Sequence, residues 1–322
     1  MSEATSILFL GDVVPYKQFK FRNDIKTVIN LECPIIKSGK PVSGKVNLRV
    51  PENLLDTIFE DKLLAVSLSN NHIMDYGVEG LNSTLFELKK KGIQFFGVNL
   101  PDDDTHNPVL IDHNGVSIAL QSIVSESTSP LVEFDDFNYL TTLGSTDLQR
   151  IGEIRKEVQK LVIYIHWGNR DSSYPSDTQV NGARKLIDAG ADIVIGSHSH
   201  APQSVEKYKH GIIAYNLGNF IMPEFRNTPS FFDEDGNSLS VFTRKLMIWN
   251  RFSWGIEIDM ATMDFRVRKF FFIADRIIEL KSTPLDRYIM LPDNFNEERY
   301  NSIMSRHLKR RRLRRKISEM LL

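Results

Sequence analysis

Short apolar runs alternate with helical patterns over roughly the first 200 residues of the chain. The runs are rich in β-branched and aromatic residues, which is typical of buried strands. We expect strands at 7–10, 28–31, 64–68, 93–98, 109–111, 116–123, 161–165, 193–195, 204–208 and 212–215. Helical patterns lie between them, at 51–60, 78–91, 146–159 and 178–189. This alternation predicts an α/β layered fold.

The helix expected at 78–91 has the clearest pattern. Leu81, Leu85 and Leu88 are spaced so that they fall on one buried face, and Gly92 follows as a helix-ending residue. After residue 240 the pattern changes to strands at 245–250, 253–260 and 264–273. A β-rich second half facing an α/β first half indicates two sheets packed face to face, with helices outside.

Polar side chains follow the apolar runs at five places along the chain. Asp12 ends the first run, Glu32 ends the second, and Asn71 with His72 follows the run at 64–68. Two later runs end in histidines: His166 in one case, and His198 with His200 in the other. Each residue taken alone can be a turn, cap or solvated loop residue. Ligand sites in α/β sheets gather at the carboxyl ends of strands, so we expect these side chains to share one pocket.

The donor types in this set indicate a metal site. Carboxylate and amide oxygens combined with imidazoles suit manganese, iron or zinc better than magnesium alone. Imidazole is also the commonest neutral metal ligand near pH 7.

The composition is that of an ordinary globular protein and excludes several classes of site. The chain has 322 residues, 41% hydrophobic and 25% charged, with a net charge of -1, which gives no general attraction to nucleic acid. Its only cysteine, Cys33, excludes an internal disulfide framework and a cysteine-based zinc site. We find no signal peptide and no apolar stretch long enough to span a bilayer, so we expect a cytoplasmic protein.

Five separate segments resemble the motifs of a known family, in the family's order. The segments are LFLGDVV, INLECPI, SLSNNHIMDYG, IHWG and GADIVIGSHSHAPQSVE…GIIAYNLGNF. They resemble the CapA family of capsule and poly-γ-glutamate synthesis proteins, a branch of the calcineurin-like metallophosphoesterases, over roughly residues 5–222. The resemblance implies a four-layer αββα sandwich of two mixed sheets and a site for two divalent metal ions (Mn, Fe or Zn).

The resemblance also implies roles for the strand-end residues. Those that match metal ligands are Asp12, Glu32, Asn71, His166, His198 and His200, with Glu32 in the bridging position. His72 matches a histidine that lies beside the metals and protonates the leaving group, and Asp75 is placed to orient it. The segment after HWG, Asn169 to Tyr174, lacks the family's usual Glu-Tyr pair, so the substrate-facing loop differs from that of the family.

Three further side chains are candidates for substrate contact: Arg170, Gln203 and Asn219. Arg170 would hold an anionic group, or else be solvated. Gln203 and Asn219 would contact substrate, or else satisfy backbone groups of their loops. We expect the polar segment 37–50 to be an excursion, that is, a long loop outside the regular strands and helices.

The basic end of the chain is a distinct segment. We expect a main domain at 1–295 and a basic amphipathic helix or tail at 296–322, with eight Lys and Arg residues between Arg306 and Lys316. Such a helix can lie on the anionic inner face of a membrane, or dock on its own domain. Nucleic acid is not an expected partner.

Together these features predict a metal-dependent, phosphoesterase-like hydrolase in bacterial capsule or surface-polysaccharide biosynthesis. Its expected partner is an anionic or sugar-containing precursor. The alternative is an accessory subunit of a synthase or export complex, which binds polymer or precursor without turning it over.

Overall fold

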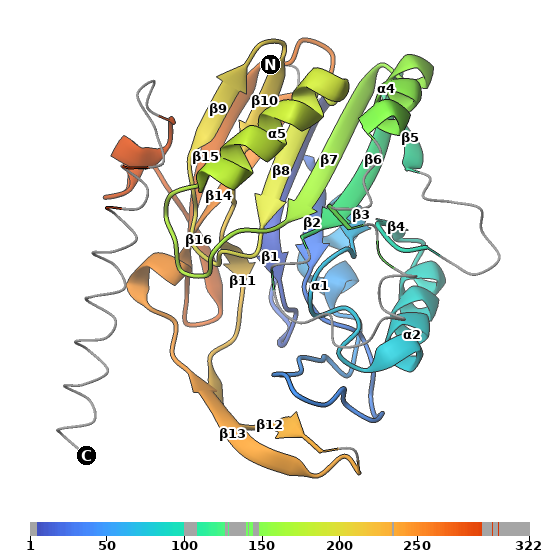
Figure 1. The fold of residues 1–322 in the computed structure, drawn as a ribbon, viewed down its shortest axis with the longest axis vertical. Helices are drawn as coiled ribbons and strands as arrows, with labels where there is room; N and C mark the ends of the chain where they lie inside the picture. The colour runs from blue at the N-terminus through green and yellow to red at the C-terminus, as the bar shows by residue number, and fades with distance from the viewer. Residues whose placement is uncertain are drawn as a thin grey trace.

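Two mixed sheets lie face to face in the computed structural model of this protein (Figure 1). The structure describes residues 5–99, 108–125, 148–233 and 235–291, together with the single residues 128, 140, 142, 143, 298 and 302. The first sheet contains β1 (Ser6–Val13), β2 (Lys26–Leu31), β3 (Leu63–Ser67), β4 (Gln94–Phe96), β11 (Asn219–Ile221), β14 (Phe252–Asp259), β15 (Phe265–Ile273) and β16 (Arg276–Leu280). The second contains β5 (Val109–His113), β6 (Val116–Val124), β7 (Lys160–His166), β8 (Ile193–Ser197), β9 (Val205–Tyr208) and β10 (Gly211–Ala214).

In the part of the chain that the structure describes, four helices cover the outer faces of the two sheets. They are α1 (Leu55–Phe59), α2 (Gly77–Lys90), α4 (Leu148–Glu157) and α5 (Asp177–Ala189). Short 3₁₀ turns occur at η2 (Glu60–Lys62), η4 (Ile248–Arg251) and η5 (Asp286–Tyr288). A two-stranded ribbon of β12 (Phe225–Phe232) and β13 (Ser238–Arg244) extends away from the sheets (Figure 1).

The alternation of side chains along β1 explains why the molecule has layers. Ile7 and Phe9 point to one side and pack between the sheets with Tyr164. Leu8 and Leu10 point to the other side and pack with residues of α1 and α2. A third buried cluster lies between the second sheet and helices α4 and α5. Three cores separated by two sheets make the predicted αββα sandwich, which is confirmed.

The central strands of both sheets run parallel and bring their carboxyl ends to one edge. In the first sheet β1, β2, β3 and β4 pair in parallel, and in the second β6, β7, β8 and β10 do so. These strands are nearly continuous apolar runs because both of their faces are buried. The expected helix at 78–91 is also confirmed, with Leu81, Leu85 and Leu88 buried on α2.

The C-terminal strands are arranged differently from our expectation. β14 pairs antiparallel with β1, and β15 and β16 extend the same sheet, so the β-rich end does not form an opposing sheet of its own. The predicted strand at 245–250 is wrong, because Asn250 N donates to Met247 O and closes the turn η4. Strands β11, β12, β13 and β16 were not predicted.

The expected helix at 51–60 is shorter than predicted. It begins only at Leu55, because the Asn53 side chain accepts a hydrogen bond from Leu55 N (3.1 Å) and holds a turn ahead of α1. Within the described ranges, no helix is long and apolar enough to cross a membrane. The predicted basic tail lies outside the described residues except for Glu298 and Ser302.

Candidate metal centre

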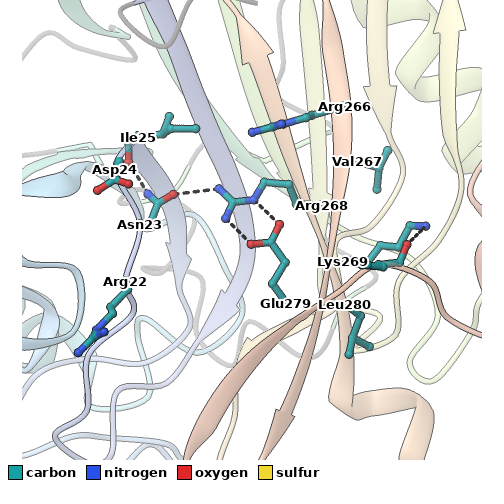
Figure 2. Close-up of a pocket in the computed structure, with 11 residues that line it drawn as sticks. Arg22, Asn23, Asp24, Ile25, Arg266, Val267, Arg268, Lys269, Glu279 and Leu280 are labelled. Carbon is teal, nitrogen blue, oxygen red and sulfur yellow. Dashed lines mark hydrogen bonds and ion pairs between the residues drawn. The ribbon is translucent and has the colours of Figure 1, made fainter.

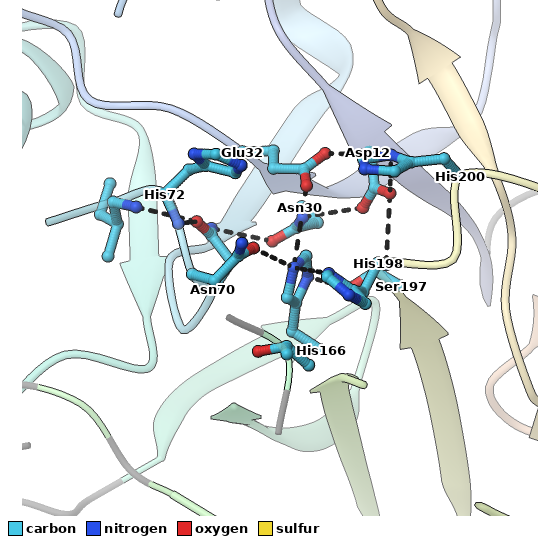
Figure 3. Close-up of polar contacts among 12 residues, drawn as sticks. Asp12, Asn30, Glu32, Asn70, His72, His166, Ser197, His198 and His200 are labelled. Atoms are coloured by element: carbon cyan, nitrogen blue, oxygen red, sulfur yellow. Dashed lines mark hydrogen bonds and ion pairs between the residues drawn. The ribbon is translucent and has the colours of Figure 1, made fainter. Parts of the chain in front are cut away.

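The carboxyl ends of five strands from both sheets meet at one buried point. Asp12 lies in β1, Glu32 directly follows β2, and Asn71 follows β3. His166 ends β7, and the loop after β8 carries the two remaining histidines. Figure 3 shows most of these side chains turned toward one another. All six residues predicted as metal ligands are therefore brought together: Asp12, Glu32, Asn71, His166, His198 and His200.

The distances between their donor atoms are short. His200 Nδ1 lies 3.5 Å from Asp12 Oδ2 and 3.8 Å from Glu32 Oε2. His166 Nε2 lies 3.7 Å from Glu32 Oε1, 3.1 Å from His198 Nδ1 and 2.7 Å from Asn71 Oδ1. Two groups of potential ligands result, each with donor atoms within 4.8 Å of one another, and Glu32 belongs to both.

Glu32 is the least satisfied side chain of the cluster. It is fully buried, and neither carboxylate oxygen has a hydrogen-bond partner among the described residues. Burial raises the pKa of Glu32 well above its ordinary value, and the neighbouring charge of Asp12 raises it further. A carboxyl group in this state is either protonated or paired with a cation held between its oxygens and the surrounding donors.

The three histidines are held in the neutral form that binds metals. Burial lowers the pKa of His166, His198 and His200 well below the ordinary value. The positive charges of Arg244 and Arg170 lower the pKa of His200 further. Neutral imidazoles beside buried carboxylates are a donor set suited to transition metals.

The loop that carries His198 and His200 has an unusual backbone. Both residues adopt positive φ, 94° and 58°, a region that non-glycine residues enter rarely and that is enriched at functional sites. Just before them, β8 passes so close to Tyr215 that a Cβ at Gly196 would lie 1.8 Å from the Tyr215 carbonyl oxygen. The close approach and the two strained residues turn both imidazoles into the cluster.

Several polar residues hold the cluster in place and were not predicted. Asn30 donates to Asp12 Oδ1 (2.9 Å), Ser197 Oγ bonds His166 Nδ1 (2.8 Å), and Asn250 donates to the His200 carbonyl (2.9 Å). Asn30 shares a strand face with Glu32, two residues on, and that period-2 spacing was an available signal. Asn250 lies about 50 residues from His200, and no local pattern connects them.

His72 and Asp75 lie at one side of the cluster, as predicted for a proton donor and the residue that orients it. His72 Nδ1 bonds Asp75 Oδ2 at 2.7 Å. Asp75 is fully buried, and its carboxylate also pairs with Lys45, whose Nζ lies 2.6 Å from Oδ1. Burial lowers the pKa of His72, while Asp75 opposes that shift. Lys45 lies in the predicted excursion, where nothing in the sequence marked it.

The three predicted substrate residues have different surroundings. Arg170 is exposed. Gln203 is buried, and its amide donates to the carbonyl groups of Ser172 (3.1 Å) and Tyr174 (3.0 Å). The Asn219 side chain bonds His200 Nδ1 (2.9 Å) and the Asn250 carbonyl. Gln203 thus holds the loop at 172–174, and Asn219 holds the ring of His200. Substrate contact by all three residues stays a prediction.

An arginine on the ribbon also reaches this region. Arg244, the last residue of β13, pairs with Asp171 Oδ1 at 3.4 Å. Asn250 donates to the same oxygen (3.0 Å) and links it to His200. The ribbon thus contributes a cation next to the cluster.

A pocket of about 380 Å³ lies away from the cluster, between the segment before β2 and strands β15 and β16 (Figure 2). Its central arginine, Arg268, forms two bonds with Glu279 (2.8 and 2.6 Å) and one with Asn23 (2.9 Å). Arg266 pairs with Glu257 and Lys269 with Asp286. Because these cations are already neutralised, we assign this pocket no ligand.

Comparisons with known proteins agree with the motifs. The model of the family described as "Bacterial capsule synthesis protein PGA_cap" matches residues 14–224. The capsule biosynthesis protein CapA of Bacillus anthracis is 28% identical over 204 residues, 61% of this chain and 50% of that protein. The PGA biosynthesis protein CapA of Bacillus subtilis is 28% identical over 216 residues, 66% of this chain and 57% of that protein.

A third relative is a probable polyglutamine synthesis accessory protein of Mycobacterium tuberculosis. It is 25% identical over 218 residues, 60% of this chain and 54% of that protein. The chain thus spans about half the length of these curated relatives. The family match covers most of the described domain and every residue of the cluster except Asp12. On this evidence the chain belongs to the bacterial capsule synthesis family PGA_cap.

Proposed function

We propose that this protein is a dinuclear metal-dependent hydrolase, phosphoesterase-like in its chemistry, which acts in the synthesis of a bacterial capsule or surface polymer. The observation that carries the proposal is the Glu32 carboxylate, buried without a hydrogen-bond partner among the described residues and shared by two ligand groups. The role in polymer synthesis is supported by the names of the relatives, and the hydrolytic chemistry by the residues of the cluster.

The residues present fit two divalent ions. Asp12, Glu32 and His200 would hold one ion; Glu32 would also hold the second, with Asn71, His166 and His198. The mixture of oxygen and imidazole donors favours Mn, Fe or Zn. When bound, the ions would supply Lewis-acid polarisation of the attacked centre and a nucleophile derived from water at neutral pH.

The protein's own residues would manage the proton and the substrate's charge. Asp75 binds His72 Nδ1 and fixes the ring, so that in the imidazolium form the Nε2 proton would be the one transferred to the leaving group, leaving the neutral Nδ1–H ring. Arg170 lies at the exposed rim, where its charge reaches Glu32 and the histidines and would attract an anionic precursor. This arrangement suits a phosphoester or another anionic ester of a sugar or polymer precursor.

The second candidate is a binding role without turnover. It is favoured by the relative whose name describes an accessory protein. In that case the same centre would hold metal and an anionic polymer or precursor as part of a synthase or export complex.

Metal analysis and turnover separate the candidates. Protein purified without chelator should contain about two metal ions per chain and hydrolyse bis(p-nitrophenyl) phosphate. Asp12→Asn should lose metal and activity, whereas Asp61→Asn, which alters an exposed carboxylate, should retain both. Metal-loaded protein that turns over neither a phosphodiester nor a phosphomonoester would favour the binding role, and protein that binds no metal would exclude both.

A further inference from the structure

A buried lysine outside the predicted site contacts Asp75, the hydrogen-bond partner of His72. Lys45 lies in the segment between β2 and α1, and its side chain is 7% exposed. Lysine is rarely buried to this degree unless its charge is paired. Its position therefore needs an explanation in terms of its partners.

The Lys45 ammonium connects both ends of the turn that carries His72. Its Nζ lies 2.6 Å from Asp75 Oδ1 and also donates to the carbonyl oxygen of Asn71. Asn71 belongs to the candidate metal centre, and Asp75 orients the candidate proton donor. One buried cation thus contacts two functional parts of the turn at once.

The two oxygens of Asp75 are divided between different partners. Oδ1 pairs with Lys45, while Oδ2 accepts from Leu48 N (2.5 Å) and bonds His72 Nδ1 (2.7 Å). Because Lys45 and Leu48 are in the same segment, that segment fixes the rotation of the carboxylate. The rotation of the carboxylate in turn fixes the plane and the tautomer of the His72 ring.

The segment that carries Lys45 is held by backbone hydrogen bonds to two other parts of the chain. Val42 N donates to the Asp75 carbonyl (2.9 Å), and Phe231 N on the ribbon donates to the Lys45 carbonyl (3.2 Å). Lys45 is therefore held on a backbone that is hydrogen-bonded on both sides, which limits the movement of its ammonium.

We propose that Lys45 is a positioning residue that sets the direction of His72 toward the leaving group and fixes the Asn71 carbonyl beside the metal centre. The proposal rests on the hydrolase function proposed above. It assigns Lys45 no contact with substrate: the lysine acts through Asp75 and through the backbone of Asn71.

The test compares two phosphodiesters of the same shape, one releasing p-nitrophenolate and the other phenolate, which depends more on protonation. Lys45→Met keeps the apolar stem and removes the charge. We expect it to slow release of phenolate roughly 10- to 100-fold more than release of p-nitrophenolate, the usual effect of a misplaced catalytic group. Lys37→Met, a matched change at an exposed lysine of the same segment, should affect neither substrate.

A second readout does not depend on activity. In metal-free protein, ¹⁵N signals of the His72 ring should report Nδ1–H in the wild type and a mixture of tautomers in Lys45→Met. Equal slowing of both substrates, or unchanged His72 signals, would overturn the proposal. A wild type without turnover would defeat the hydrolase function alone, since the ring signals still test Lys45.

Lys45→Arg covers the case in which Lys45→Met does not fold. It keeps the buried charge but changes its reach, and guanidinium is not equivalent to ammonium at such a site. We expect the same dependence on leaving group in weaker form, and an equal loss on both substrates would contradict the positioning role.

Discussion

Among single residues, Glu32 both destabilises the metal-free fold through its buried charge and belongs to both groups of potential metal ligands. Without a cation, its buried charge opposes folding. Burial raises its pKa in the folded protein, whereas the unfolded chain keeps the ordinary value. The folded state therefore holds the Glu32 proton more tightly, and the penalty is present above the folded-state pKa and disappears as the pH falls through it.

Glu32→Gln should accordingly stabilise the metal-free protein at pH 8 by about 1 to 3 kcal/mol, the usual cost of an unsatisfied buried group. The gain should shrink as the pH falls toward the ordinary glutamate value. Urea unfolding at several pH values measures it, with the exposed Glu52→Gln as the control. A gain that is constant with pH would contradict the assignment of the penalty to Glu32 ionisation.

A substitution at His72 can distinguish proton transfer from metal binding. Its ring bonds Asp75 and belongs to neither ligand group. His72→Ala should therefore retain metal and lower turnover by roughly 10² to 10⁴, the usual contribution of general acid catalysis. Metal content and kcat, measured on the same preparation, check this. Loss of metal in the variant would show that His72 is a ligand.

At the scale of elements, the ribbon is part of the site although it extends from the body. One strand supports the Lys45 backbone, and the other ends in Arg244 beside Asp171. The charge of Arg244 reaches His200 and Glu32, which lie in the cluster. A cation in this place attracts anionic substrates over the range that salt screening permits.

Arg244→Met should therefore raise KM for an anionic phosphodiester more than it lowers kcat, because it removes attraction and leaves the ligands intact. Arg226→Met, at an exposed position on the same ribbon, is the matched control. Steady-state kinetics at low and high salt measures the effect, which should diminish as salt rises. A pure loss of kcat would instead indicate that Arg244 acts by holding Asp171.

At the scale of the whole molecule, metal binding should be coupled to stability, since the cluster joins the two sheets. A divalent ion present at about 100 times its Kd adds about 2.7 kcal/mol to the free energy of unfolding. We expect Mn²⁺ or Zn²⁺ to raise Tm, EDTA to reverse the rise, and Asp12→Asn to abolish it. A wild-type Tm insensitive to every divalent ion would leave the cluster without a metal role.

The basic end of the chain gives a second prediction at this scale. If residues 306–316 lie on an anionic surface, each basic residue adds about 1 kcal/mol of attraction. The full chain should co-sediment with anionic vesicles and not with neutral ones, and salt should weaken the binding. A chain truncated after Asn296 should not co-sediment. Equal behaviour of the two chains would exclude the membrane role of the tail.

Local patterns in the amino-acid sequence were sufficient to predict the features that depend on neighbouring residues. Apolar runs ending in Asp12, Glu32 or His166 predicted both the buried strands and the polar residues at their ends, because strand periodicity and strand termination are short-range properties. The order of the motifs was enough to indicate the family. The α/β class followed from the succession of elements, whereas the division of the strands between the two sheets did not, because β14 to β16 extend the sheet of β1.

The contacts between segments far apart in the sequence became apparent in the folded protein alone. The pairing of β14 with β1, the bond from Asn250 to the His200 carbonyl, and the contact of Lys45 with Asp75 join residues with no shared local pattern. The turn at η4 replaced a predicted strand because buried partners of Asn250 outweighed local propensity. Such contacts depend on burial and long-range hydrogen bonding, which are properties of the folded chain and not of any short stretch of it.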